Sequence, residues 1–98
     1  MYLLLPHEGG RKAAVRGSYR PIHNFGLPNC QMANATIDFA SDEQLIPGET
    51  RQFDLEFIRF PALEQEMRPG REWTIQEGRE VVGKGTVVAV LEEQGGQD

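Results

Sequence analysis

The 98-residue sequence predicts one small all-β domain, and three observations lead to that prediction. No stretch carries apolar residues at sustained helical spacing, whereas several alternate apolar and polar residues as half-buried strands do. Turn signals recur between these stretches at short intervals. The chain is also too short for two separate cores, yet long enough to bury one core without disulfides or metal.

Strand patterns occur in six segments, of which the fourth is the clearest. There Phe53, Leu55 and Phe57 alternate with polar residues, so one apolar face should line the core. The predicted strands are residues 2–5, 19–25, 33–39, 52–57, 72–76 and 81–91. Turn signals separate them at Gly9-Gly10, Pro28-Asn29, Pro47-Gly48 and Pro69-Gly70. This spacing is typical of sandwiches and closed barrels, and a barrel leaves no exposed edge.

One segment has a weak helical pattern, because Leu63 and Met67 lie four residues apart. Pro61 and Pro69 confine this pattern to about one turn. We therefore interpret residues 62–67 as a loop.

Composition indicates an ordinary domain that stays in solution, with 39% hydrophobic and 26% charged residues. The N-terminal apolar run, residues 1–6, is far too short for a signal-peptide core or a membrane span, which predicts a cytoplasmic protein. Cys30 is the only cysteine and excludes an internal disulfide. Residues 92–98 have nothing apolar to bury and are predicted to be a flexible acidic tail, so the domain spans residues 1–91.

Charge is unevenly distributed along the chain. A formal net charge of -5 argues against general affinity for nucleic acid, which requires excess Lys and Arg. Yet Arg11, Arg16 and Arg20 accompany Tyr19 near two adjacent glycines, whose backbone could approach a phosphate closely. This basic patch allows two interpretations, a contact for RNA or arginines paired with the surplus acids.

Residues 78–84 have the spacing of a phosphate-binding P-loop, but the chemistry is missing. Gly85 occupies the place of the magnesium-binding Ser or Thr, and residues 86–91 are strand-like rather than helical. We interpret Gly83 and Gly85 instead as permitting a bulge or a close backbone approach within a strand.

No other motif indicates catalysis. His7, His23 and Cys30 have no recognised metal-ligand spacing, and Ser18 and Ser41 lie in no nucleophile motif. We interpret His23, beside Asn24, as a strand or turn residue satisfied by hydrogen bonds. Neighbouring carboxylates lie in hydrophilic surroundings that would not raise a pKa. The sequence therefore predicts no catalytic residue, no metal and no cofactor, and hence a protein that is not an enzyme.

Several short motifs follow one another in a specific order. They are Glu8-Gly9-Gly10-Arg11, Tyr19-Arg20-Pro21 with Phe25, Pro47-Gly48-Glu49, Phe60-Pro61, residues 73–78 and residues 82–87. Together they resemble the C-terminal, third domain of elongation factor Tu and related translation GTPases. The resemblance spans about residues 1 to 91, and an ordered set of motifs is far more specific than any single one.

The resemblance implies a six-stranded closed antiparallel barrel. In that family the barrel packs against the GTPase domain and helps to hold the T-stem of aminoacyl-tRNA. This chain has neither a GTPase domain nor a second barrel, so GTP hydrolysis is not carried over. The family counterpart of Arg20 lies near the GTPase-domain interface, and the counterparts of Glu77 and Gly78 approach the tRNA backbone.

Departures from the family pattern affect the expected ligand. Ile22 stands in place of a glutamine, and Glu80 makes a basic position acidic. We therefore expect a stand-alone, non-catalytic interaction module that binds a protein partner in translation; the alternative is a tRNA-like RNA-binding module that uses the basic patch. A free-standing barrel would also expose the family's domain-facing surface, which favours homo-oligomers. The candidate contact residues are Arg11, Arg16, Tyr19, Arg20, Glu77 and Gly78.

Overall fold

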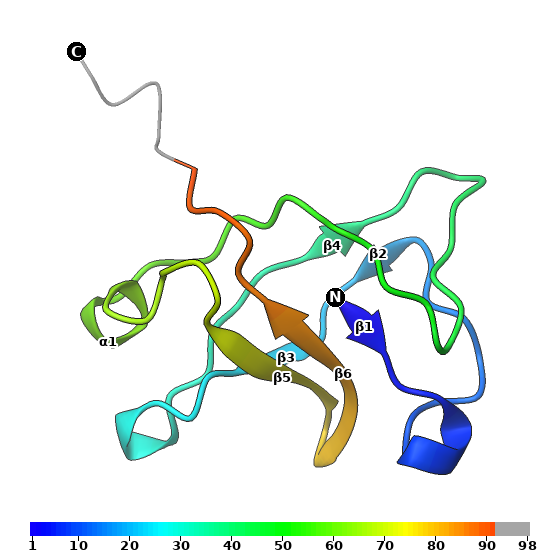
Figure 1. The fold of residues 1–98 in the computed structure, drawn as a ribbon, viewed down its shortest axis with the longest axis horizontal. Coiled ribbons are helices and arrows are strands. Elements are labelled where there is room, and N and C mark those ends of the chain that lie inside the picture. The colour runs from blue at the N-terminus through cyan, green and yellow to red at the C-terminus, as the bar shows by residue number, and fades with distance from the viewer. Residues whose placement is uncertain (92–98) are drawn as a thin grey trace.

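A computed structural model describes residues 1–91, and the tail predicted for residues 92–98 lies outside them. The described chain is mostly extended, with almost no helix, and it forms two antiparallel sheets (Figure 1). The all-β prediction is therefore confirmed. In this part of the chain, every helix is too short to cross a lipid bilayer.

The larger sheet has four strands in the order β1-β6-β5-β3, and the smaller sheet pairs β2 with β4. The strands are β1 (Tyr2–Leu3), β2 (Ser18–Tyr19), β3 (Ile22–Asn24), β4 (Ile37–Asp38), β5 (Glu72–Glu77) and β6 (Glu80–Thr86). The remaining elements are the 3-10 turns η1 (Pro6–Glu8) and η2 (Pro28–Cys30) and the single-turn helix α1 (Pro61–Glu64). Strand pairing does not close either sheet into a barrel among the described residues.

The β5–β6 hairpin is the longest paired unit, and glycines shape it. Gly78 has a φ of 62°, a left-handed conformation that glycine adopts without a steric penalty, and it turns the chain between the strands. Ile75 pairs with Gly83 while Gln76 pairs with Val81, so Val82 is the extra residue of a bulge. The bulge predicted for this glycine-rich segment is therefore confirmed.

The predicted close approach is also confirmed at both strand glycines. A Cβ atom on Gly83 would lie 2.9 Å from the Tyr2 carbonyl oxygen of β1. A Cβ atom on Gly85 would lie 2.4 Å from Cζ2 of Trp73, on the neighbouring strand. The absence of a side chain at Gly85 therefore lets the Trp73 ring lie flat across β6. Because residues 80–86 form a strand, no helix begins where a P-loop would require one.

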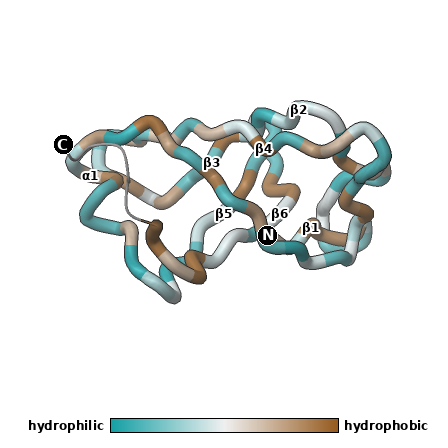
Figure 2. The backbone as a smooth tube through the Cα atoms, turned by 90° about the horizontal axis from the view of Figure 1, so that it is seen from above, coloured by the Kyte–Doolittle hydropathy of each residue, from teal (hydrophilic) through white to brown (hydrophobic). Residues whose placement is uncertain are grey.

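The prediction of a strand over residues 52–57 is wrong, although its side-chain pattern is confirmed. Phe53, Leu55 and Phe57 are half-buried and pack on the core, while the polar residues between them are exposed. Figure 2 shows this alternation of hydrophilic and hydrophobic residues beside the N-terminus. The segment is extended, but its only backbone bonds within residues 1–91 lie at its ends, through Arg51 and Ile58. Without a ladder it is not a strand.

Four other predicted strands are shorter than expected. Residues 2–5 retain only β1. Residues 19–25 divide into β2 and β3, because Pro21 between them has no N–H group to donate to a ladder. Residues 33–39 retain only β4 and an isolated bridge from Ala33 to His23. The last strand ends at Thr86 rather than continuing through residues 87–91.

The loop predicted for residues 62–67 begins instead as helix α1. Pro61 occupies the first turn, where its missing N–H group costs nothing and its fixed φ angle suits a helix. Leu63 is buried in the core from this turn, which explains why the segment folds inward.

Two hydrophobic clusters form the core. One consists of Phe25, Leu27, Ala33, Leu63, Trp73, Ile75 and Val82, and the other of Leu3, Val15, Ile37, Phe39 and Leu45. Met1 and Leu55 pack against both clusters and so connect them. The extended segment 52–57 therefore covers the junction between the two halves of the core.

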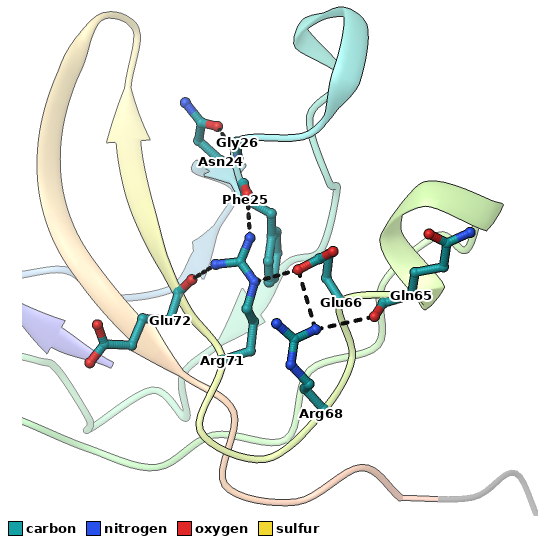
Figure 3. A network of polar contacts seen from close by, with 8 residues as sticks. All are labelled: Asn24, Phe25, Gly26, Gln65, Glu66, Arg68, Arg71 and Glu72. Atoms are coloured by element: carbon teal, nitrogen blue, oxygen red, sulfur yellow. Dashed lines mark hydrogen bonds and ion pairs between the residues drawn. The ribbon is translucent and has the colours of Figure 1, made fainter.

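Arg71 ties three segments together at one end of the larger sheet (Figure 3). Its Nε donates to Glu66 at 2.7 Å, its Nη2 donates to the Phe25 carbonyl at 2.5 Å, and its Nη1 donates to the Glu72 carbonyl. The guanidinium also lies 5.5 Å from the centre of the Phe25 ring. The hydrogen bond from Arg71 lowers the pKa of Glu66.

We expect Arg71→Lys to lower the free energy of unfolding by about 1 to 2 kcal/mol. The single ammonium group of lysine cannot donate to all three acceptors that the planar guanidinium group reaches. The matched change Arg68→Lys, at a side chain that is 59% exposed, should alter stability by less than about 0.5 kcal/mol. Urea unfolding of both variants measures the difference. Equal midpoints for the two variants would show that the Arg71 contacts do not stabilise the fold.

Candidate functional site

Three of the six predicted contact residues meet in one cluster. Glu77 Oε2 accepts a hydrogen bond from Arg11 Nη1 at 2.5 Å and another from the Tyr19 hydroxyl at 2.5 Å. The Arg11 guanidinium lies 5.8 Å from the centre of the Tyr19 ring, within cation-π range. We call Arg11, Tyr19 and Glu77 the Arg-Tyr-Glu cluster.

Three separate segments supply this cluster. Tyr19 ends β2, Glu77 ends β5, and Arg11 lies in the loop that follows η1. Gly10 fixes the course of that loop, because a Cβ atom there would lie 2.3 Å from the Leu4 carbonyl oxygen. Of the two adjacent glycines noted in the sequence, Gly10 therefore allows close packing of the chain upon itself, while Gly9 adopts a left-handed conformation with a φ of 95°.

Electrostatically the cluster is balanced rather than basic. Arg11 and Glu77 form an ion pair whose side chains are 28% and 38% exposed, and Arg11 Nε also donates to the Ala13 carbonyl at 3.0 Å. Burial raises the pKa of Tyr19, and its hydrogen bond to ionised Glu77 raises that pKa further. The hydroxyl therefore stays protonated and keeps donating at physiological pH.

The other predicted contact residues do not join this cluster. Arg16 and Arg20 are exposed, and within residues 1–91 neither makes a hydrogen bond or an ion pair. Gly78 follows Glu77 directly and forms the exposed hairpin turn. Of the arginines in the predicted basic patch, Arg11 is thus neutralised by an acid, while two remain open to solvent.

We expect Glu77→Gln to lower the pKa of Tyr19 toward its ordinary value, because the substitution removes the negative charge and releases Arg11 toward the phenol. The pKa of Tyr2 is raised mainly by its own hydrogen bond to Glu8 and should not change. Tyrosine Cζ chemical shifts followed against pH distinguish the two residues. An unchanged Tyr19 titration would contradict the geometry of the cluster.

A second polar site lies buried in the core at His23, which belongs to β3 and is hydrogen-bonded, as the sequence indicated. His23 is fully buried, its Nδ1 accepts a hydrogen bond from Trp73 Nε1 at 3.1 Å, and its Nε2 lies 3.2 Å from the Ala35 carbonyl. Because Nδ1 accepts, Nε2 carries the proton and donates to Ala35. Burial lowers the pKa of His23, which keeps the ring neutral. The contact between His23 and Trp73 joins residues 50 positions apart, which no local pattern indicates.

Both nitrogens of His23 are engaged, so this ring stabilises the core rather than offering a ligand. Cys30 lies apart from it on the surface, at the end of η2. Among residues 1–91, no three side chains of the types that bind metals gather in one place.

A cavity of about 220 Å³ lies between the extended segment 52–57 and the residues that follow β6. Phe53, Leu55 and Phe57 line it on one side, Val88 and Val90 on the other, and Trp73 beneath. It shares no residue with the Arg-Tyr-Glu cluster. The two features therefore form distinct surfaces.

No family model matches this chain.

Proposed function

We propose that the chain is a non-catalytic module that binds a protein partner through the surface around Tyr19, Arg20 and Glu77. We further propose that its two sheets are parts of a six-stranded antiparallel barrel resembling the third domain of elongation factor Tu. The ordered motifs of the sequence and the antiparallel all-β architecture support this relation. The proposal that the partner is a component of translation rests on the same resemblance.

The observation that carries the proposal is the pairing of Arg11 with Glu77. A phosphate that approached Arg11 would have to compete with a carboxylate at 2.5 Å, in a molecule of net charge -5. The same cluster offers a partner protein an aromatic ring and a hydrogen-bonded carboxylate. Arg20, which follows Tyr19 in the chain, is exposed and makes no ion pair within residues 1–91. Tyr and Arg are the residue types enriched at the energetic centres of protein interfaces.

RNA binding is the second candidate function, and the exposed Arg16 and Arg20 favour it. Phosphate contacts release counterions, so this mode predicts affinity for RNA that falls steeply as salt is raised. Protein binding through a mixed and partly apolar surface predicts a weaker dependence on salt.

Capture from ribonuclease-treated lysate tests the proposal with three tagged proteins, the original chain, Arg20→Glu and Arg68→Glu. The two variants make the same charge reversal, but Arg68 lies after α1 and outside the proposed surface. We expect one protein to be retained by the original chain and by Arg68→Glu, and to fall about tenfold or more with Arg20→Glu. Loss of every specific protein after ribonuclease treatment, or equal retention by both variants, would overturn the proposal.

A further inference from the structure

The cavity beside segment 52–57 has the features of an incomplete sheet. Within residues 1–91, the backbone groups of residues 52–57 and 88–91 make no hydrogen bonds with other backbone groups. Segment 52–57 is nevertheless extended, with its side chains alternating between core and solvent. An extended backbone with unpaired N–H and C=O groups is a template for another strand.

Apolar side chains surround the opening on both sides. Beyond β6, Val88 is 63% exposed, Val90 is 47% exposed and Leu91 is 68% exposed, and all three line the cavity opposite the half-buried side chains of segment 52–57. Figure 2 shows residues 87–91 as a strongly hydrophobic run that leads to the grey trace. Apolar surface gathered around a cavity, rather than scattered singly, indicates a site of association.

The exposed face of segment 52–57 is acidic. Asp54 and Glu56 point away from the core, on either side of Leu55. Glu56 also borders a second hollow beside α1, where Glu64 adds another acid and Arg59 a base. A strand lying along this edge would therefore place its apolar side chains toward Leu55 and Phe57 and its polar side chains beside carboxylates. Opposite charges on neighbouring strands stabilise their pairing.

We propose that the barrel stays open at this cavity and edge, and that they bind an extended segment of a partner protein as an added β-strand that alternates apolar and basic residues. Backbone hydrogen bonds to residues 52–57 would supply affinity, and the apolar cavity together with the acidic rim would select the sequence. This surface lies apart from the Arg-Tyr-Glu cluster, so the inference goes beyond the proposed function. Either surface could be shown to bind without the other.

The same charges argue against a second copy of this chain as the occupant. If two 52–57 edges paired antiparallel about Leu55, Asp54 of one copy would face Glu56 of the other. Like charges directly opposite each other destabilise a strand pair. The chain's own residues 92–98 contain three acids and no base, so they carry the same sign as the rim.

Trp73 provides the readout, because it is the only tryptophan and lines the cavity. The probe is an acetylated octapeptide of alternating Lys and Val. Two control peptides test the charge and the backbone hydrogen bonds separately. One alternates Glu and Val and so reverses the charge. The other keeps Lys and Val but has alternate backbone amides methylated, which removes hydrogen-bond donors. We expect a saturable change in Trp73 emission with the first peptide, and binding at least tenfold weaker for both controls.

Two double variants complete the experiment. Asp54→Lys with Glu56→Lys should weaken the Lys-Val peptide about tenfold or more and improve the Glu-Val peptide. Asp38→Lys with Asp42→Lys makes the same charge change at exposed positions outside the cavity and should leave both affinities nearly unchanged. Urea midpoints close to that of the original chain establish that each variant is folded. Absence of a saturable response by the folded original chain, equal binding of methylated peptide, or equal loss in both double variants would each overturn the proposal.

Discussion

Gly85→Val is expected to destabilise the fold strongly, because a side chain at this position would clash with the Trp73 ring. Its Cβ atom would lie 2.4 to 2.6 Å from three atoms of the Trp73 ring. That ring cannot retreat, because it stacks on Phe25 with centroids 4.8 Å apart and donates a hydrogen bond to His23. Overpacking a close contact costs about 1 to 3 kcal/mol and sometimes more, and we expect a loss of about 3 kcal/mol or more here.

Thr86→Val is the matched control, since it introduces the same side chain at the next position, which is exposed on β6. Valine suits a strand, so this variant should unfold within about 0.5 kcal/mol of the original chain. Urea unfolding followed by Trp73 fluorescence measures both variants. If Gly85→Val unfolds at the same midpoint as Thr86→Val, then Trp73 does not lie across Gly85.

The second large effect is expected for His23→Leu. Leucine is close to histidine in size but leaves the Trp73 indole N–H and the Ala35 carbonyl without their partner. Each buried group that loses a hydrogen bond costs about 1 to 3 kcal/mol, so the variant should lose about 2 to 4 kcal/mol of stability. His7→Leu makes the same substitution at an exposed residue of η1 and should change stability by less than about 0.5 kcal/mol.

The pH dependence of stability gives an independent test of His23. Burial lowers the pKa of His23 below its ordinary value of 6.5. Just below pH 6.5, His23 therefore binds a proton in the unfolded chain but stays neutral in the folded protein. The contribution of neutral His23 to stability is therefore complete above about pH 6.5 and is lost as the pH falls toward the lowered pKa. The original chain should lose stability in this window faster than His23→Leu. Parallel pH profiles would show that His23 is not held neutral by the fold.

Local patterns in the sequence correctly predicted which side chains are buried and where glycines allow close packing. The alternation at Phe53, Leu55 and Phe57 gave the buried face correctly, and the spacing of Gly83 and Gly85 gave the bulge and the close packing. What alternation cannot reveal is whether an extended segment finds a hydrogen-bonding neighbour. That depends on residues far away in the chain, and this is why segment 52–57 was wrongly predicted to be a strand.

The sequence likewise predicted some residues of the candidate site but not the contacts between them. Charge and residue type selected Arg11, Tyr19 and Glu77, but nothing local shows that the first two donate to one oxygen of Glu77, which lies 66 and 58 positions further along the chain. The basic patch in the sequence therefore overstates the free positive charge on the surface. Arg71 was missed, and the burial of His23 and its hydrogen-bond partners were not foreseen, because a lone arginine or histidine acquires such a role only through tertiary contacts.

We propose that the ion pair between Glu77 and Arg11 leaves a surface suited to a protein partner rather than to RNA. Titration of a fluorescent RNA hairpin shaped like a tRNA T-stem, at low and at physiological salt, tests it most directly. We predict that the original chain does not bind the hairpin saturably at physiological salt, and that Glu77→Gln, which frees Arg11, binds it more tightly than the original chain at low salt. Saturable binding by the original chain that is abolished by Arg20→Glu would contradict the claim and make RNA the ligand.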